Sequence, residues 1–244
     1  MHERCMQEEI KQQLGLQKNV QNGAPKYVAL IPAAGVGSRM GKNTPKQYLT
    51  IAGRSILQHT VNAFLNFDGV SHTYVVVSPG DAYVDDFLQP SPRLSVLRCG
   101  GETRRDSVRQ GLDAIAEEMQ DDDWVMVHDA ARPGLTAELL GKLLNEVGTN
   151  PVGGLLAMPV VDTVKRVVDG RVQTIPRDGM WLAQTPQMFR FQLLCDALDA
   201  ADQVTDEASA VEAAGHIPLL IEGHVCNLKV TLPADVEQVS QYLK

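Results

Sequence analysis

The sequence lacks the segments that mark membrane-spanning and exported proteins. No apolar run approaches the roughly 20 residues that a helix needs to cross a bilayer. The stretch from Met1 to Gln21 is polar and mixed in charge, so it does not have the apolar core of a secretory signal. We therefore expect a cytoplasmic protein with no membrane partner, and we expect residues 1–24 to form a flexible N-terminal extension.

Cysteine pairs with the spacing of metal or redox sites are also missing. The four cysteines lie far apart in the chain, and none belongs to a C-x-x-C pair: Cys5, Cys99, Cys195 and Cys226. This spacing argues against a zinc site and against a disulfide framework, and it suits a reducing compartment.

Acidic residues are absent from one long segment. The protein has 30 Asp and Glu residues and a net charge of −8, which argues against nucleic acid or an anionic membrane surface as a partner. Between Lys11 and Phe67 there is no acid at all, although this segment contains several Lys and Arg residues. A locally cationic segment in an acidic protein indicates a small polyanionic ligand, and the alternative is a solvated basic face.

The rest of the composition is that of a soluble globular protein, with 44% hydrophobic and 21% charged residues. The length suits one domain, which we place at residues 25–244. Apolar runs of strand length alternate with helical patterns, and this predicts an α/β fold: a mostly parallel, twisted sheet with helices on both faces. The predicted strands are 27–31, 72–77, 94–97 and 124–127, and the predicted helices are 55–67, 104–119, 136–147, 191–201, 206–214 and one after Pro233.

One segment departs from this alternation. Two β-rich runs, 163–168 and 171–175, are separated by Asp169-Gly170, a dipeptide typical of a two-residue hairpin turn. We predict a β-hairpin that projects from the domain as an arm at about residues 160–176. Its valines and Ile175 are apolar and need covering, so we expect the arm to mediate a homodimer. An arm folded back on its own domain is the alternative.

A glycine-rich loop follows the first predicted strand. Ligands of parallel sheets bind beyond the carboxyl ends of the strands, and small residues from Ala33 onward let backbone N–H groups approach a phosphate. A dinucleotide fingerprint fails because Met40 stands where the third glycine is needed. A P-loop fails because five residues separate Gly35 from Gly41 and Lys42 is followed by Asn43.

The pattern that remains is A-A-G-x-G-x-R-M from Ala33, followed by Pro45-Lys46-Gln47, and it resembles the signature of sugar-nucleotide pyrophosphorylases and related nucleotidyltransferases. Further segments follow in order: GGETRRDSV from Gly100, HDAARP from His128, PVVDTVK from Pro159, QTPQ from Gln184, TDEAS from Thr205 and NLKVT from Asn227. Together these segments resemble the 2-C-methyl-D-erythritol 4-phosphate cytidylyltransferases of the non-mevalonate isoprenoid pathway, from residue 28 to the end of the chain.

The resemblance implies a Rossmann-like nucleotidyltransferase fold and transfer of a cytidylyl group from CTP to 2-C-methyl-D-erythritol 4-phosphate, with release of pyrophosphate. A phosphomonoester with a second pKa of about 6 is already dianionic, so the reaction needs positioning and cations rather than a general base. The resemblance assigns Arg39 and Lys46 to stabilising the transition state. It assigns Arg177 and Lys229 to positioning the polyol phosphate, and these four are the predicted catalytic residues.

The other predicted site residues fall into three groups. The nucleotide-binding group is Ala33, Ala34, Gly35, Gly101, Arg104 and Ser107. The substrate-binding group is Thr163, Thr185, Thr205 and Arg132. Asp129, at the end of a predicted strand, is the candidate for holding Mg²⁺ or a substrate hydroxyl.

Alternatives stay open for several of these residues and for the function. Ser107 and Thr205 can be helix caps, and Asp129 can be an ion pair with Arg132. The resemblance implies that Arg177 and Thr163 enter the neighbouring subunit's site in the homodimer. The competing functions are cytidylyl transfer to another polyol phosphate, such as ribitol 5-phosphate, and nucleotide binding without turnover.

Overall fold

The computed structural model describes residues 23–35, 45–201 and 204–243. A seven-stranded sheet, in the order β11-β7-β10-β6-β1-β4-β5, forms its centre. Its strands are β1 (Tyr27–Pro32), β4 (His72–Val76), β5 (Leu94–Leu97), β6 (Trp124–Val127), β7 (Gly153–Pro159), β10 (Trp181–Arg190) and β11 (Leu219–Glu222). Only β10 runs antiparallel to its neighbours, β6 and β7. The predicted fold class, a mostly parallel sheet, is confirmed.

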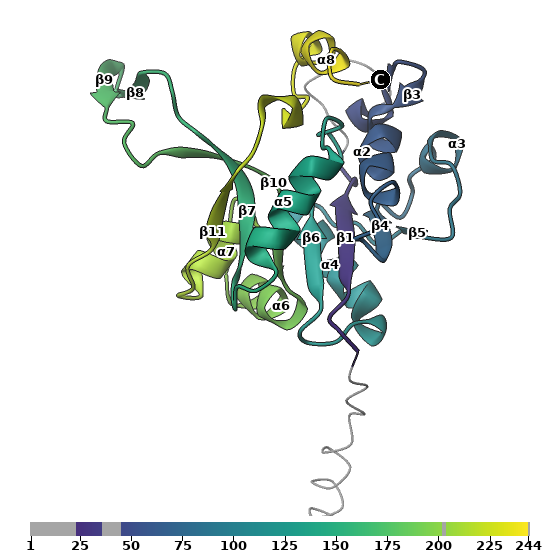
Figure 1. Ribbon diagram of the computed structural model, residues 1–244. Helices are drawn as coiled ribbons and strands as arrows, with labels where there is room; N and C mark the ends of the chain where they lie inside the picture. The colour runs from purple at the N-terminus through teal and green to yellow at the C-terminus, as the bar shows by residue number, and fades with distance from the viewer. Residues whose placement is uncertain (1–22, 36–44, 202–203, 244) are drawn as a thin grey trace, which may run out of the picture.

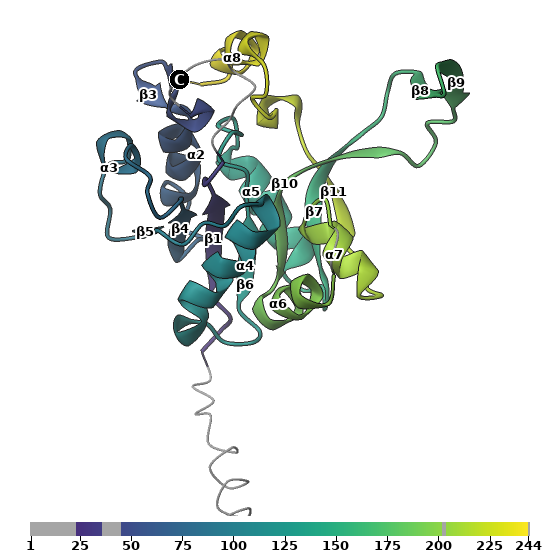
Figure 2. The same ribbon diagram turned by 180° about the vertical axis from the view of Figure 1, so that it is seen from behind.

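Helices cover both faces of the sheet, as Figures 1 and 2 show from opposite sides. On one face lie α2 (Ile56–Leu65) and α5 (Ala137–Val147), and on the other lie α4 (Arg104–Ile115), α6 (Phe191–Ala200) and α7 (Glu207–Ala213). The helix α8 (Pro233–Ser240) lies near the end of the chain, and the hairpin strands are described below. The other elements are short: α3 (Val84–Phe87), η2 (Lys46–Tyr48), η3 (Ala116–Glu118), η4 (Val225–Asn227), β2 (Thr50–Ile51) and β3 (Arg54–Ser55). No helix in these described ranges combines the length and apolarity that crossing a membrane requires.

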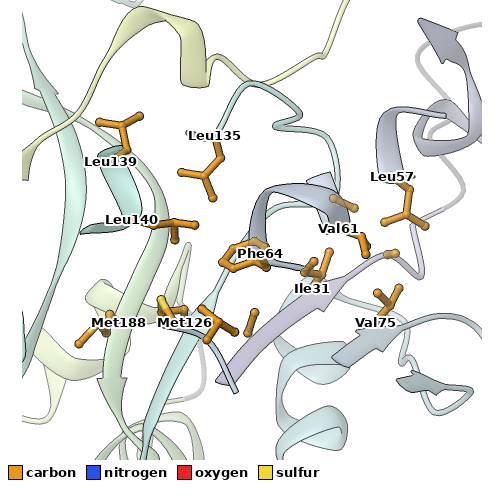
Figure 3. Close-up of a cluster of buried hydrophobic side chains, with 14 of the residues drawn as sticks. Ile31, Leu57, Val61, Phe64, Val75, Met126, Leu135, Leu139, Leu140 and Met188 are labelled. Carbon is orange, nitrogen blue, oxygen red and sulfur yellow. The ribbon is translucent and has the colours of Figure 1, made fainter. Parts of the chain in front are cut away.

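The alternation of side chains along β1 builds a core on each face. Ala29 and Ile31 face the α2 and α5 side, where they pack in the cluster that contains Phe64 and Leu140 (Figure 3). Val28 and Leu30 face the other side and belong to the cluster of α4, α6 and α7. Because both faces are covered, the β1 side chains from 28 to 31 are all buried, as expected for a central parallel strand.

The helices that the sequence predicts are present with small shifts at their ends. Thr136 is the N-cap of α5, since its side chain accepts a hydrogen bond from the Leu139 N–H. The helix predicted to run to Met119 ends instead at Ile115 and continues as the 3₁₀ turn η3. The strands β7, β10 and β11 were not predicted, and they occupy one half of the sheet.

The predicted hairpin is confirmed and extends away from the sheet. Its strands are β8 (Val164–Val168) and β9 (Arg171–Ile175). Asp169 and Gly170 have φ angles of 49° and 75°, and a two-residue turn of this kind requires positive φ at both positions. Figures 1 and 2 both show the hairpin at the end of two long segments that leave β7 and β10. Val167 and Val172, which are 65% and 67% exposed, leave its apolar side uncovered.

Candidate active site

Segments from five parts of the chain surround one cavity at the carboxyl end of β1. The cavity has a volume of about 190 Å³, and it brings together nine of the predicted site residues: Ala33, Ala34, Gly35, Lys46, Gly101, Arg104, Ser107, Asp129 and Lys229. All of the predicted nucleotide-binding residues are in this set. The convergence follows from the fold, because β1, β5 and β6 are parallel and their carboxyl ends lie at the same edge of the sheet.

A second cavity of about 140 Å³ adjoins the first. Arg104, Asp129 and Lys229 line both cavities, so the two compartments meet at these side chains. Three of the predicted substrate-binding residues line the second one: Arg132, Thr185 and Thr205. The predicted nucleotide group therefore lines the first cavity, and three of the four residues of the predicted substrate group line the second.

The remaining predicted site residues lie elsewhere. Thr163 and Arg177 flank the hairpin, and both are exposed. Neither of them lines either cavity of this single chain. Arg39 lies outside the described residues.

Asp129 is the centre of a cluster of charges. One of its oxygens accepts from Arg104 at 3.0 Å, and the other contacts Arg132 at 3.3 Å and Lys229 at 3.0 Å. Burial alone raises the pKa of Asp129, but the three cations outweigh it and hold that pKa far below its usual range. Asp129 is therefore a carboxylate at neutral pH, and the ion pair with Arg132, the alternative for Asp129, is present.

Arg104 is held on its other side by Glu207, a residue that the sequence analysis did not select. The guanidinium donates to the two Glu207 carboxylate oxygens at 2.6 and 2.9 Å. Glu207 is buried, which raises its pKa, although Arg104 opposes this effect. The cluster holds three cations and two carboxylates, so its net charge is positive and suits a phosphate ligand.

This arrangement does not fit a metal ion held by Asp129, because both of its oxygens already accept from cations. A further dication would face three positive side chains. Within the described ranges there is no group of three or more His, Cys, Asp or Glu side chains that could hold a metal ion.

The two predicted catalytic lysines come from distant segments and converge. Lys46, in η2, donates to the carbonyl of Val230 at 3.0 Å. Val230 directly follows Lys229, whose Nζ contacts Asp129. The contact between Lys46 and Val230 thus holds η2 against the segment that carries the second lysine.

The wall opposite the glycine loop is the turn from β5 into α4. Thr103 is the N-cap of α4, so the alternative of Ser107 as a cap is wrong. The buried Ser107 hydroxyl donates to the Thr103 carbonyl and accepts from the Gly101 N–H, and it thereby holds the turn. A Cβ atom at Gly100 would lie 2.4 Å from the Ala34 Cβ, so only glycine allows this close approach of the two walls.

His128, Thr185 and the Asp129 backbone form a chain of hydrogen bonds. Nε2 of His128 lies 3.1 Å from the Arg132 carbonyl, so it carries the proton, and Nδ1 accepts from the Thr185 hydroxyl. The same hydroxyl accepts from the Asp129 N–H at 3.0 Å. Burial lowers the pKa of His128 to about 4, so the ring is neutral. His128 therefore has a local hydrogen-bonding role, and Thr185 helps to fix Asp129.

Thr205 was predicted either to bind substrate or to cap a helix. The N-cap of α7 is Asp206, whose side chain accepts from the Ser209 N–H, so a capping role for Thr205 is wrong. Thr205 precedes the cap, and its hydroxyl contacts Asp206 and Ser209 at 3.4 Å. Buried amides that sequence reasoning missed complete this region: Gln184, Gln187 and Asn227.

Comparisons with known proteins agree with this geometry. The family model described as 2-C-methyl-D-erythritol 4-phosphate cytidylyltransferase matches residues 27–244. A protein of Dechloromonas aromatica (strain RCB) with that name is 48% identical over 224 residues, which cover 90% of this chain and 98% of the relative. A solved 4-diphosphocytidyl-2C-methyl-D-erythritol synthase has a TM-score of 0.82 at 42% identity, and the match covers 91% of this chain and all of that one. The Francisella tularensis 2-C-methyl-D-erythritol 4-phosphate cytidylyltransferase has a TM-score of 0.77 at 35% identity, with 89% of this chain and 100% of that one covered.

Proposed function

Because the chain belongs to the 2-C-methyl-D-erythritol 4-phosphate cytidylyltransferase family, we propose that its two joined cavities transfer the cytidylyl group of CTP to 2-C-methyl-D-erythritol 4-phosphate. The products are 4-diphosphocytidyl-2-C-methyl-D-erythritol, an intermediate of isoprenoid biosynthesis, and pyrophosphate. The observation that carries the proposal is the meeting of two cavities at Arg104, Asp129 and Lys229, one for each substrate.

In this reaction a phosphate oxygen of the polyol phosphate attacks the α-phosphorus of CTP, and the bond to pyrophosphate breaks. The attacking phosphate is already dianionic near neutral pH, so no side chain has to remove a proton. The protein's contribution is to bring two polyanions together and to meet the charge that spreads over the reacting phosphoryl group. Lys46 and Lys229 line the nucleotide compartment and supply positive charge for this.

Asp129 organises those cations. A lysine and two arginines placed side by side repel one another, and a carboxylate between them lowers that repulsion. Since the Asp129 N–H and the His128 ring are fixed through Thr185, the carboxylate is held in one place. The cations are thus oriented before the substrates bind, which is the condition for efficient electrostatic stabilisation.

The requirement for Mg²⁺ is part of the proposal. Mg²⁺ prefers oxygen ligands and commonly binds through substrate phosphates with one or two carboxylates. With Asp129 engaged by cations, we expect the triphosphate to provide most of the ligands, and the ion to neutralise charge on CTP.

A homodimer with shared sites is also proposed. The exposed valines of the arm support it, because apolar surface of this kind marks an interaction site. Thr163 and Arg177 lie at the base of the arm and outside this chain's cavities, where a partner's site can receive them. We propose a cytoplasmic location, which agrees with the free thiols of Cys99, Cys195 and Cys226.

Pyrophosphate release with a panel of substrates tests the proposed function. With Mg²⁺, we expect turnover for CTP and 2-C-methyl-D-erythritol 4-phosphate, much slower turnover with ATP or with ribitol 5-phosphate, and none in excess EDTA. Equal rates with ribitol 5-phosphate contradict the assigned acceptor, and full turnover in EDTA contradicts the metal requirement. Binding of CTP without turnover on any acceptor points to a non-catalytic nucleotide-binding module.

A further inference from the structure

The carbonyl groups at the start of the glycine loop are all held by side chains from behind. The Gln47 side-chain amide donates to the carbonyls of Ala33 at 2.9 Å and Gly35 at 3.1 Å. The Ser78 hydroxyl donates to the carbonyl between them, that of Ala34, at 3.0 Å. Because carbonyl oxygens only accept, the NH₂ end of Gln47 must face them, and both of its protons are used.

The N–H groups of these three residues, unlike their carbonyls, are not all hydrogen-bonded. The Ala33 N–H donates to the Val76 carbonyl at 2.7 Å and continues the sheet. The N–H groups of Ala34 and Gly35 have no hydrogen-bond partner among the residues that the structure describes. Both residues line the nucleotide cavity. Successive unpaired N–H groups form a surface that accepts anions and other hydrogen-bond acceptors.

Gln47 is itself fixed in place. It is 4% exposed and lies in the middle of η2. Its neighbour Tyr48 is buried and donates to Asp81 at 2.8 Å, and its other neighbour, Lys46, donates to the Val230 carbonyl. The side-chain amide therefore cannot move away from the loop without disturbing η2.

We propose that Gln47 is a positioning residue for CTP: its side-chain amide holds the Ala33 carbonyl, and with it the peptide unit that carries the Ala34 N–H, so that this N–H stays available to the nucleotide. Ser78 holds the peptide unit that carries the Gly35 N–H in the same way, through the Ala34 carbonyl. This inference rests on the proposed function, since it assumes that CTP occupies the cavity. Without the amide, the peptide unit between Ala33 and Ala34 is free to rotate, and this rotation presents a carbonyl dipole to a polyanion. The loss falls on nucleotide binding, because the second substrate's compartment does not include Gln47.

The test compares Gln47→Met with Gln58→Met by calorimetric titration of CTP and by thermal unfolding. Methionine keeps the length of the side chain and removes its donors. Gln58 is a matched control: it is 3% exposed, makes two hydrogen bonds, to Asn62 and from the Gln89 N–H, and lies outside both cavities. We expect Gln47→Met to weaken CTP binding about tenfold, as expected for roughly 1.4 kcal/mol of lost preorganisation, with no change in KM for the polyol phosphate. Gln58→Met is expected to lower the melting temperature without changing CTP affinity.

A second variant, Gln47→Glu, tests whether CTP affinity depends on the hydrogen bond that residue 47 donates, through its dependence on pH. Gln47→Glu places a carboxyl group beside two carbonyls, where burial raises its pKa. Above that pKa it cannot donate, and below it the protonated acid donates one hydrogen bond. The CTP affinity of Gln47→Glu relative to wild type is therefore expected to rise as the pH falls from 8 to 5.

The outcomes distinguish failure of the proposed function from failure of the proposed role of Gln47. If the wild-type protein does not bind CTP, the proposed function fails. If wild type binds and Gln47→Met binds equally well, or if Gln58→Met weakens CTP binding as much, the inference is overturned. If the Gln47 variants do not fold, Ser78→Ala removes the donor to the Ala34 carbonyl alone. An unchanged CTP affinity in Ser78→Ala then overturns the inference, and a roughly threefold loss, about half of the effect in free energy, supports it.

Discussion

Replacing Asp129 by asparagine removes the one anion that three cations share. Breaking a buried ion pair on one side costs about 3–5 kcal/mol, because the charges that remain are buried without compensation. The lower end of that range applies, about 3 kcal/mol, since asparagine keeps one accepting oxygen and Arg104 stays paired with Glu207. Lys229 adds little, because its side chain is 40% exposed and a solvated pair contributes at most about 1 kcal/mol.

The pH dependence of this loss has a definite sign. The folded-state pKa of Asp129 is depressed, so its stabilising contribution is complete above the unfolded value of about 3.9 and is lost as the pH falls below it. Urea denaturation measures the free energy of unfolding of both proteins. The difference between wild type and Asp129→Asn should be constant from about pH 5 to 8 and should become smaller below about pH 4.

A control variant separates stability from activity. Asp123→Asn also changes a buried aspartate, which accepts from the Lys26 and Gln120 N–H groups, and it lies outside both cavities. We expect this control to lose stability and keep kcat, whereas Asp129→Asn loses both. A loss of less than about 1 kcal/mol in Asp129→Asn, or a difference that does not become smaller in acid, refutes the charge-cluster argument.

Three further predictions follow from the site. Lys46→Ala should lower kcat on the order of 10² to 10³ and change the Kd for CTP much less; an increase in KM alone shows that Lys46 only binds the ground state. Co-refolding of Lys46→Ala with Arg177→Ala should restore activity, because a shared-site heterodimer has one site with both residues intact; no recovery in confirmed heterodimers excludes shared sites. The His128 ring resonances should not shift between pH 5.5 and 8 in NMR spectra, since burial lowers the pKa of His128 to about 4, and a midpoint near 6.5 contradicts its buried, neutral state.

The parallel half of the sheet could be predicted from sequence because its strands are continuous apolar runs. Tyr27–Ile31 and Trp124–Val127 have this form, and the structure places them side by side. The antiparallel strand β10 has no such signal, since Gln184, Pro186 and Gln187 interrupt it. Its place between β6 and β7 depends on tertiary pairing, and β7 begins with two glycines that lower its strand propensity.

In the site, too, some residues could be predicted from the local sequence and others depend on contacts between distant segments. Sequence order places Asp129 at the end of β6 and Lys46 after the glycine loop, and both line the predicted cavity. Sequence could not show that Arg104 lies between Asp129 and Glu207, because Glu207 is 103 residues away along the chain. Nor could it identify Gln47, whose role depends on which carbonyls its side chain reaches.

Phosphorus-31 NMR of a reaction mixture tests the central claim most directly. The protein is incubated with CTP, 2-C-methyl-D-erythritol 4-phosphate and Mg²⁺, and the spectrum is followed over time. We predict that the phosphomonoester signal of the acceptor disappears while an asymmetric diphosphate diester and free pyrophosphate appear in equal amounts, and that Lys46→Ala slows all three changes together. Formation of CMP and pyrophosphate with the acceptor unchanged contradicts the account, because the cytidylyl group would then have gone to water.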